Sequence, residues 1–197
     1  MDYSPLRYPG GKTKIAPLVN FIIEKAGIKQ GIYIEPFAGG AGVALALLLN
    51  NKVDNIVIND IDIAIYAFWY SVLNYTGEFV QLIKDTPVTI EEWRKQKGIF
   101  ISKNQENLLE LGFATFFLNR TNRSGILKAG PIGGLDQNGN YLIDARFNKA
   151  NLIKRVERVA QYKEKISLYN LEIKDFINNI LPKYKNNAFV YFDPPYY

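Results

Sequence analysis

The residues best placed to do chemistry are Asp193, Pro194, Pro195 and Tyr196, which directly follow an apolar stretch at residues 188–192. Two consecutive prolines exclude a helix, so the turn holds a carboxylate, a prolyl carbonyl and an aromatic ring in a fixed relation. The Asp193 carboxylate and the Pro194 carbonyl suit the two N–H groups of a planar amine, and the Tyr196 ring suits stacking on its base. The turn favours an amine substrate over the alternative, a strand that merely ends at two prolines beside a buried tyrosine.

A glycine turn, EPFAGGAG at residues 35–42, joins an apolar strand at 32–36 to a helical stretch at 43–49. Glycine allows a ligand to approach the backbone, and a helix N-terminus offers N–H groups without internal partners. Asp60 follows Gly40 by 20 residues and ends a second apolar strand, where nucleotide-binding folds place a carboxylate on ribose hydroxyls. The turn lacks the GxGxxG pattern of a pyrophosphate site. Such a turn alone is more often structural, but together with Asp60 it indicates a ligand that carries a ribose.

Composition removes several other kinds of chemistry. The chain of 197 residues has no cysteine and no histidine, which excludes a thiolate nucleophile, a cysteine-ligated metal and the commonest general base. Catalysis must then use carboxylates, lysines, hydroxyls, backbone groups or a cofactor, and we expect no metal. At 48% hydrophobic and 22% charged residues, the sequence is that of a folded domain. Without an apolar run of about 18 residues or a signal-peptide core, a cytoplasmic protein without membrane contact is expected.

The net charge of +5 is unevenly distributed. Residues 1–30, 84–128 and 146–165 together carry +11, which concentrates positive charge where a polyanion could bind. Any one stretch is equally well explained as a solvated helix face, but three together favour nucleic acid. The segment NRTNRSG at 119–125 adds arginines, which suit guanine edges and phosphates, and asparagines, which suit adenine edges. The alternative is a polar loop whose side chains cap neighbouring helices.

Strands and helices alternate at both ends of the chain and predict a doubly wound, Rossmann-like α/β domain made of residues 1–75 and 165–197. Residues 76–164 interrupt it as a mainly helical insertion. Within the insertion, Thr89 and Glu92 form a capping-box pattern, and Asn138-Gly139 predicts a tight hairpin turn near 130–145. The remaining expected elements are strands at 55–59, 167–171 and 188–192 and helices at 61–73, 149–165 and 175–181.

Five short motifs occur in the order found in the Dam-like DNA adenine-N6 methyltransferases, the D12 class or alpha group. They are YPGGK at residues 8–12, EPFAGG at 35–40, Asn59-Asp60, NRT at 119–121 and DPPY at 193–196. The sequence resembles this family over essentially its whole length. The resemblance implies S-adenosylmethionine as the cofactor, a Rossmann-like sheet that binds it, and double-stranded DNA with a flipped adenine as the substrate.

The resemblance also implies roles for individual residues. The catalytic motif is Asp193, Pro194, Pro195 and Tyr196. The cofactor residues are Tyr8, Lys12, Phe37, Ala38, Gly39, Gly40, Asp60, Asp175 and Phe176, the last two against the cofactor's adenine. The DNA-binding residues are Asn119, Arg120, Thr121, Asn122, Arg123, Ser124 and Arg146. The alternatives are a solvated lysine at Lys12, and a helix N-cap followed by a core aromatic at Asp175 and Phe176.

Two further interpretations remain open at this stage. Turns of the D/N-P-P-Y type also serve amine methylation in ribosomal RNA and glutamine side chains, although the long basic insertion between Gly42 and Asp193 favours DNA. Relatives continue beyond the DPPY motif, so we expect a C-terminally truncated chain with an incomplete sheet and an open strand edge. Such a chain is expected to be a monomer or an edge-mediated dimer, and the alternative function is an inactive fragment that only binds cofactor or DNA.

Overall fold

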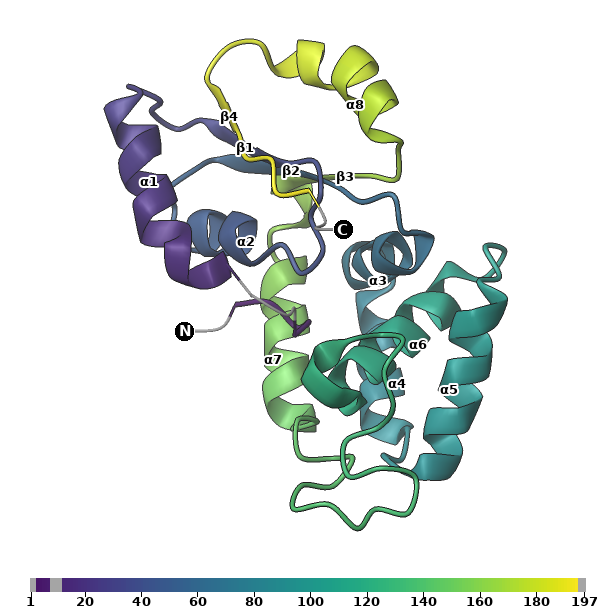
Figure 1. The fold of residues 1–197 in the computed structure, drawn as a ribbon. Coiled ribbons are helices and arrows are strands. Elements are labelled where there is room, and N and C mark those ends of the chain that lie inside the picture. Colours follow the sequence, from purple (N-terminus) through teal and green to yellow (C-terminus); the bar gives the residue numbers. More distant parts are fainter. Residues whose placement is uncertain (1–2, 8–11, 195–197) are drawn as a thin grey trace. The chain divides into compact units, whose positions relative to one another are not determined.

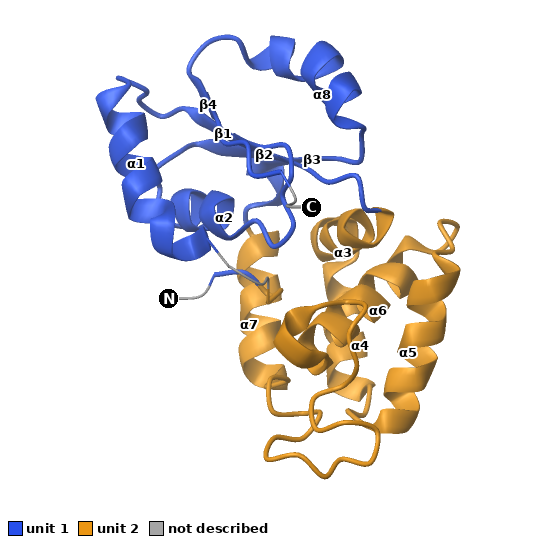
Figure 2. Ribbon diagram, in the orientation of Figure 1, with its two compact units in different colours: residues 1–4, 11–62, 162–197 blue, residues 5–10, 63–161 orange. Residues whose placement is uncertain are grey.

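The computed structural model describes residues 3–7 and 12–194, and the chain forms two compact units (Figure 2). Unit 1 consists of residues 1–4, 11–62 and 162–197, and unit 2 of residues 5–10 and 63–161. The units divide after residues 62 and 161, whereas the sequence placed the divisions after 75 and 164. The assignment of cofactor binding to one part and target recognition to the other stays a prediction.

Unit 1 is built on a parallel four-stranded sheet in the order β3-β2-β1-β4. Its strands are β1 (Ile32–Glu35), β2 (Asn55–Asn59), β3 (Ile166–Tyr169) and β4 (Ala188–Val190). Tyr33 of β1 lies opposite Ile56 of β2 and Phe189 of β4, so β1 is paired on both sides. The sequence expectation of a mixed α/β fold with a parallel sheet is confirmed, because short uninterrupted apolar runs form strands that are covered on both faces.

Helices cover both faces of this sheet (Figure 1): α1 (Ala16–Lys25) and α2 (Gly42–Leu49) lie on one face and α8 (Ile173–Asn179) on the other. Every residue of α2 from Val43 to Leu49 is buried, as its uniformly apolar sequence requires. On the opposite face, Phe176 and Ile180 pack against Ile34 and Val57. Three short 3-10 helices complete the unit, namely η1 (Lys12–Ile15), η3 (Lys163–Lys165) and η4 (Leu181–Tyr184).

Unit 2 is a bundle of five α-helices with an aromatic core. The helices are α3 (Ile63–Asn74), α4 (Thr76–Asp85), α5 (Ile90–Ser102), α6 (Leu108–Thr121) and α7 (Lys149–Ala160), with a 3-10 turn η2 (Arg123–Gly125) after α6. Phe68, Phe79 and Phe116 meet with ring centroids 5.4 to 6.0 Å apart. Gly112 lets α6 approach α3, because a Cβ there would collide with the Ala67 carbonyl and the Ser71 hydroxyl.

The predicted start of α5 is confirmed: the Thr89 hydroxyl oxygen accepts a hydrogen bond from the Glu92 N–H at 3.2 Å. The Glu92 side chain, which a full capping box would turn back to Thr89, instead accepts from Gln96 Nε2 at 2.6 Å. The helix N-terminus therefore uses half of the expected motif.

The predicted hairpin near residues 130–145 is wrong, because this segment holds turns and no strand pair; its one bridge joins Pro131 to Asn122. Neither Asn138 nor Gly139 has the positive φ that a tight hairpin turn needs, and Gln137 takes the left-handed conformation instead. The Gln137 amide donates to the carbonyls of Ile132 and Gly134, and its Oε1 accepts from Ile143 N–H. One side chain thus satisfies backbone groups that a strand ladder would otherwise pair.

Candidate active site

The turns after β1, β2 and β4 meet at one edge of the sheet, because parallel strands present their carboxyl ends on the same side. Gly39, with φ of +45°, directs its N–H to Asp60 Oδ2 at 2.8 Å. Ala38 N–H donates to the Asn59 carbonyl at 2.9 Å. Ala41 also has a positive φ of 47°, an unusual conformation for a residue with a Cβ. The glycine turn therefore folds tightly over the end of β2.

Asn59, a buried residue at the end of β2, ties this edge together. Its Nδ2 donates to the carbonyls of Pro36 and Leu171 at 3.0 Å, and its Oδ1 accepts from Leu171 N–H at 2.9 Å. Asn170 Nδ2 adds a bond to the Asp60 carbonyl at 2.7 Å. Sequence analysis treated Asn59 only as part of a motif, although a polar residue at the end of an apolar strand was the available signal.

The Asp60 carboxylate retains capacity for a ligand. It accepts from Gly39 N–H and, at 2.9 Å, from Asp62 N–H, which leaves further lone pairs on its two oxygens. Burial raises the pKa of Asp60, the two backbone hydrogen bonds lower it, and the charge of Asp62 raises it. A half-buried carboxylate beside a glycine turn is well suited to accept hydrogen bonds from hydroxyl groups, so the residues present fit a ribose-containing cofactor.

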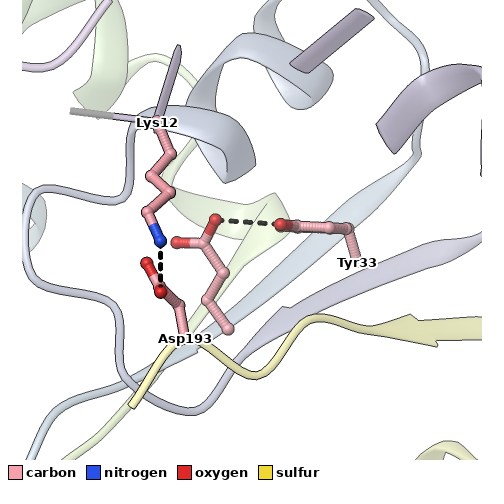
Figure 3. A network of polar contacts seen from close by, with 4 residues as sticks. Lys12, Tyr33 and Asp193 are labelled. Carbon is pink, nitrogen blue, oxygen red and sulfur yellow. Dashed lines mark hydrogen bonds and ion pairs between the residues drawn. The ribbon is translucent and has the colours of Figure 1, made fainter. Parts of the chain in front are cut away.

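Lys12 and Asp193, which the resemblance assigned to different roles, are in direct contact. The Lys12 ammonium donates a hydrogen bond to Asp193 Oδ1 and forms an ion pair with it (Figure 3). The two side chains are 32% and 27% exposed, so the pair is open to solvent from one side. Tyr191 N–H donates to the Ile34 carbonyl at 2.9 Å, which extends the β4 pairing and fixes where the turn with Asp193 begins.

A second carboxyl group, that of Glu35, lies buried behind this pair. Its Oε1 accepts from the Tyr33 hydroxyl at 3.0 Å and from Ala44 N–H in the first turn of α2 at 3.2 Å. Burial raises the pKa of Glu35 to about 7; both hydrogen bonds lower it, and the nearby charge of Asp193 raises it. Burial, followed by the charge of Glu35, likewise raises the pKa of Tyr33. Sequence analysis missed Tyr33 and Glu35 as site residues because both belong to an apolar strand.

The other residues predicted for this site have mixed outcomes. Phe37 is half-buried in the glycine turn, whereas Ala38, Gly39 and Gly40 are buried there. Pro194 is exposed. Tyr8, Pro195 and Tyr196 lie outside the described residues, so the predicted aromatic platform stays a prediction.

The prediction that Phe176 lies against a cofactor is contradicted by its burial. Its ring has no exposed surface and packs in the core under α8, with the Tyr169 ring edge-on at 5.9 Å. Phe176 therefore matches the alternative of a core aromatic. Asp175, in the first turn of α8, is exposed, and its contact with a cofactor stays a prediction.

Four predicted DNA-binding residues are buried in unit 2, at exposures of 0 to 8%: Asn119, Arg120, Thr121 and Asn122. Their polar groups already have partners inside the protein. Asn122, for example, accepts from Trp93 Nε1 at 2.7 Å and donates to the carbonyls of Ile126 and Leu127 at 3.0 Å. The structure contradicts the prediction that these four residues read DNA, because a buried, hydrogen-bonded side chain has no group left for a base.

Arg123, Ser124 and Arg146 are exposed, in contrast to the four residues before them. Ser124 has a φ of 55° inside the 3-10 turn η2, which marks a sharp change of chain direction. Residue type alone did not distinguish the buried residues 119–122 from the exposed residues 123 and 124, because both groups consist of polar residues.

Comparison with known proteins agrees with this geometry. A family model described as D12 class N6 adenine-specific DNA methyltransferase matches residues 8–197. The chain belongs to this family. The Type II methyltransferase M.MjaIII of Methanocaldococcus jannaschii is 28% identical over 212 aligned residues, which cover this whole chain and 70% of that protein.

As a D12 class DNA adenine methyltransferase, the chain acts on the N6 amine of adenine and uses a methyl donor. Asp193 follows β4 and lies at the same end of the sheet as Gly39 and Asp60. Within the described part of the chain, no helix is long and apolar enough to span a membrane, and no cluster of three acidic ligands could hold a metal ion.

Proposed function

We propose that this chain transfers the methyl group of S-adenosylmethionine to the N6 amine of an adenine that is flipped out of double-stranded DNA. The observation that carries the proposal is the convergence of Asp193, Asp60 and the glycine turn at the carboxyl ends of adjacent parallel strands. In open parallel sheets this edge is where ligands bind. The family supplies the reaction class, and the site residues named here are our assignment.

Asp193 and Pro194 act on the amine. The carboxylate and the prolyl carbonyl accept its two N–H groups, which draws the nitrogen lone pair out of conjugation with the ring. The nitrogen would then be able to accept the methyl group that S-adenosylmethionine, held by Asp60 and the turn at residues 37–40, would supply. The amine proton would then pass to the Asp193 carboxylate, which accepts it as a hydrogen bond, and from there to solvent. No histidine is required, because fixed positioning and electrostatics accelerate the step.

The cofactor side of the proposal rests on Asp60 and the turn at residues 37–40. S-adenosylmethionine supplies an electrophilic methyl group when bound. Asp60 has acceptor capacity for its ribose hydroxyls, and Gly39 and Gly40 allow its amino-acid end to approach the backbone.

The DNA side rests on exposed basic groups of unit 2. Arg123 and Arg146 are available for phosphates or guanine edges, and Ser124 for a backbone contact. A flipped adenine costs a few kcal/mol of unstacking, which an aromatic platform such as Tyr196 is suited to offset.

The decisive experiment compares Asp193→Asn with the wild-type chain in methylation of adenine-unmethylated plasmid DNA by labelled S-adenosylmethionine. We expect methyl transfer to fall by roughly two to four orders of magnitude, since a neutral amide replaces the anionic acceptor where positive charge develops. Asp54→Asn is the matched control, because Asp54 is exposed and directly precedes β2, at the amino ends of the strands and away from the candidate site. Near-wild-type methylation by Asp193→Asn would remove Asp193 from the mechanism.

A substrate comparison tests the rival amine methyltransferases. The same assay with ribosomal RNA and with a glutamine-containing peptide should give no label above background. Transfer to either of these in preference to DNA would contradict the proposal.

A further inference from the structure

Two consecutive buried side chains, Asn119 and Arg120, connect three segments of unit 2 that are far apart in sequence. Asn119 Oδ1 accepts from Arg7 N–H at 2.6 Å, and its Nδ2 donates to the carbonyls of Arg7 at 2.6 Å and Gly125 at 2.9 Å. Arg120 Nε donates to the Arg146 carbonyl at 2.9 Å, and its Nη1 donates to the Pro5 carbonyl at 3.4 Å. The end of α6 therefore holds the backbone of residues 5–7 and that of residue 146.

Gly125 makes the approach to Arg7 possible. It has a φ of +75°, and a Cβ at this position would lie 2.6 Å from the Arg7 carbonyl oxygen. Any other residue would therefore be strained and would push residue 7 away from Asn119. The Asn119 hydrogen bonds fix the main chain of Arg7 at both its N–H and its carbonyl.

The two hydrogen bonds of Arg120 bring residue 146 close to the segment that contains Arg7. The Arg7 guanidinium is half-buried and donates to the Asn122 carbonyl at 3.4 Å, whereas Arg146 is exposed. Burial lowers the pKa of Arg7, and the charge of Arg146 lowers it further, so the two cations are close enough to repel each other. Among the described residues, no carboxylate forms an ion pair with either of them.

Two like charges held close together, with no carboxylate paired to either in the described part of the chain, cost free energy in the unbound protein. An anion between the two guanidiniums would remove that cost, and guanidinium groups match the oxygens of a phosphate in a bidentate geometry. We propose that Arg7 and Arg146 form a phosphate-binding pair for the DNA backbone, which the buried Asn119 and Arg120 position. This inference rests on DNA being the substrate, and it adds Arg7, which sequence analysis did not select.

The test measures how DNA binding depends on salt. Fluorescence anisotropy with a labelled mixed-sequence duplex of about 30 base pairs, between roughly 50 and 200 mM KCl, gives the slope of log affinity against log salt. We expect Arg7→Gln and Arg146→Gln each to make this slope shallower by about 0.9, the value for one lost phosphate contact. Both should weaken binding by a similar factor on every duplex tested, because phosphates carry no base identity.

The variants are chosen so that the fold survives. Asn119 holds the main chain of residue 7, so Arg7→Gln keeps those hydrogen bonds and loses only the 3.4 Å bond from the Arg7 guanidinium to the Asn122 carbonyl. The melting temperature should therefore fall by no more than a few degrees. Lys52→Gln is the control, since Lys52 is exposed and lies outside the three basic stretches of the sequence. It removes the same charge and should leave the salt slope unchanged.

The outcomes separate this inference from the proposed function. A steep wild-type slope that neither Arg7→Gln nor Arg146→Gln alters would overturn the phosphate pair while leaving DNA as the substrate. A loss confined to one preferred sequence, with an unchanged slope, would overturn it in favour of base reading. A wild-type chain without salt-dependent DNA binding would instead contradict DNA binding as a whole.

Discussion

The Lys12 ammonium contacts the Asp193 carboxylate across 181 positions of sequence, and this ion pair joins the start of unit 1 to the turn proposed to bind the target amine. Burial is the larger cause of the raised pKa of Glu35, but Glu35 also lies close enough for the Asp193 charge to raise it. A carboxylate has about four acceptor positions. Lys12 can therefore orient Asp193 through one oxygen while the other stays available to the amine.

Lys12→Met should slow methyl transfer by about ten- to hundredfold, because an unpaired Asp193 side chain is free to leave its productive orientation. Lys12→Arg should restore most of the activity, and Lys14→Met, a change at an exposed lysine of the same 3-10 helix, should have no effect. Steady-state kinetics separates the two roles of Lys12. A raised KM for S-adenosylmethionine with unchanged kcat would instead identify Lys12 as a cofactor ligand.

Asp60→Ala should weaken binding of the demethylated cofactor product by roughly 1–3 kcal/mol, since charged hydrogen bonds to its hydroxyls are lost. Isothermal titration calorimetry measures this directly. Asp54→Ala, at the other end of β2, should bind as the wild type does. Equal affinity in the Asp60→Ala and wild-type chains would exclude Asp60 from the cofactor site.

Glu35 should make the protein less stable as pH rises. Folding raises the pKa of Glu35 from 4.5 to about 7, so between these two pH values the unfolded chain has lost a proton that the folded protein still holds. The free energy of unfolding therefore falls as the pH rises from 4.5 to about 7. Above pH 7 the burial of the charged form costs up to about 3 kcal/mol. Denaturant titrations at several pH values across this window measure the slope.

Glu35→Gln isolates this effect. Both hydrogen bonds, from Tyr33 and Ala44, end on Oε1, and a glutamine carbonyl oxygen in the same place accepts them equally. The variant should therefore match the wild type at low pH and exceed its free energy of unfolding above pH 7. A variant less stable than wild type at pH 8 would show that the charged form of Glu35 is favoured by folding.

Two glycine substitutions in unit 2 should change stability in opposite directions. Gly112→Ala should destabilise by about 1–3 kcal/mol, because the added methyl group meets the backbone of Ala67 on α3. Gly98→Ala, inside α5 with open space around it, should stabilise by about 0.5–1 kcal/mol through helix propensity. Thermal melts that show equal shifts for both variants would contradict the close packing of α3 on α6.

Sequence by itself predicted the four strands of the sheet and the end of the sheet where a ligand is expected to bind. Short apolar runs predicted the strands, and polar residues directly after them, such as Asp60 and Asp193, predicted the sheet edge where ligands bind. Both are local properties: apolar runs must be buried, and residues after parallel strands share one edge. The motif order also identified the family, because each motif is a short contiguous segment.

Only the tertiary structure decided which polar residues remain available to a ligand. Asn119 and Arg7 are 112 positions apart, and nothing in either neighbourhood shows that they bond to each other. The same holds for Lys12 with Asp193 and for the burial of Phe176 under α8. A side chain's partners depend on which distant segments pack around it, and burial converts an asparagine suited to read a base into one that holds a backbone in place.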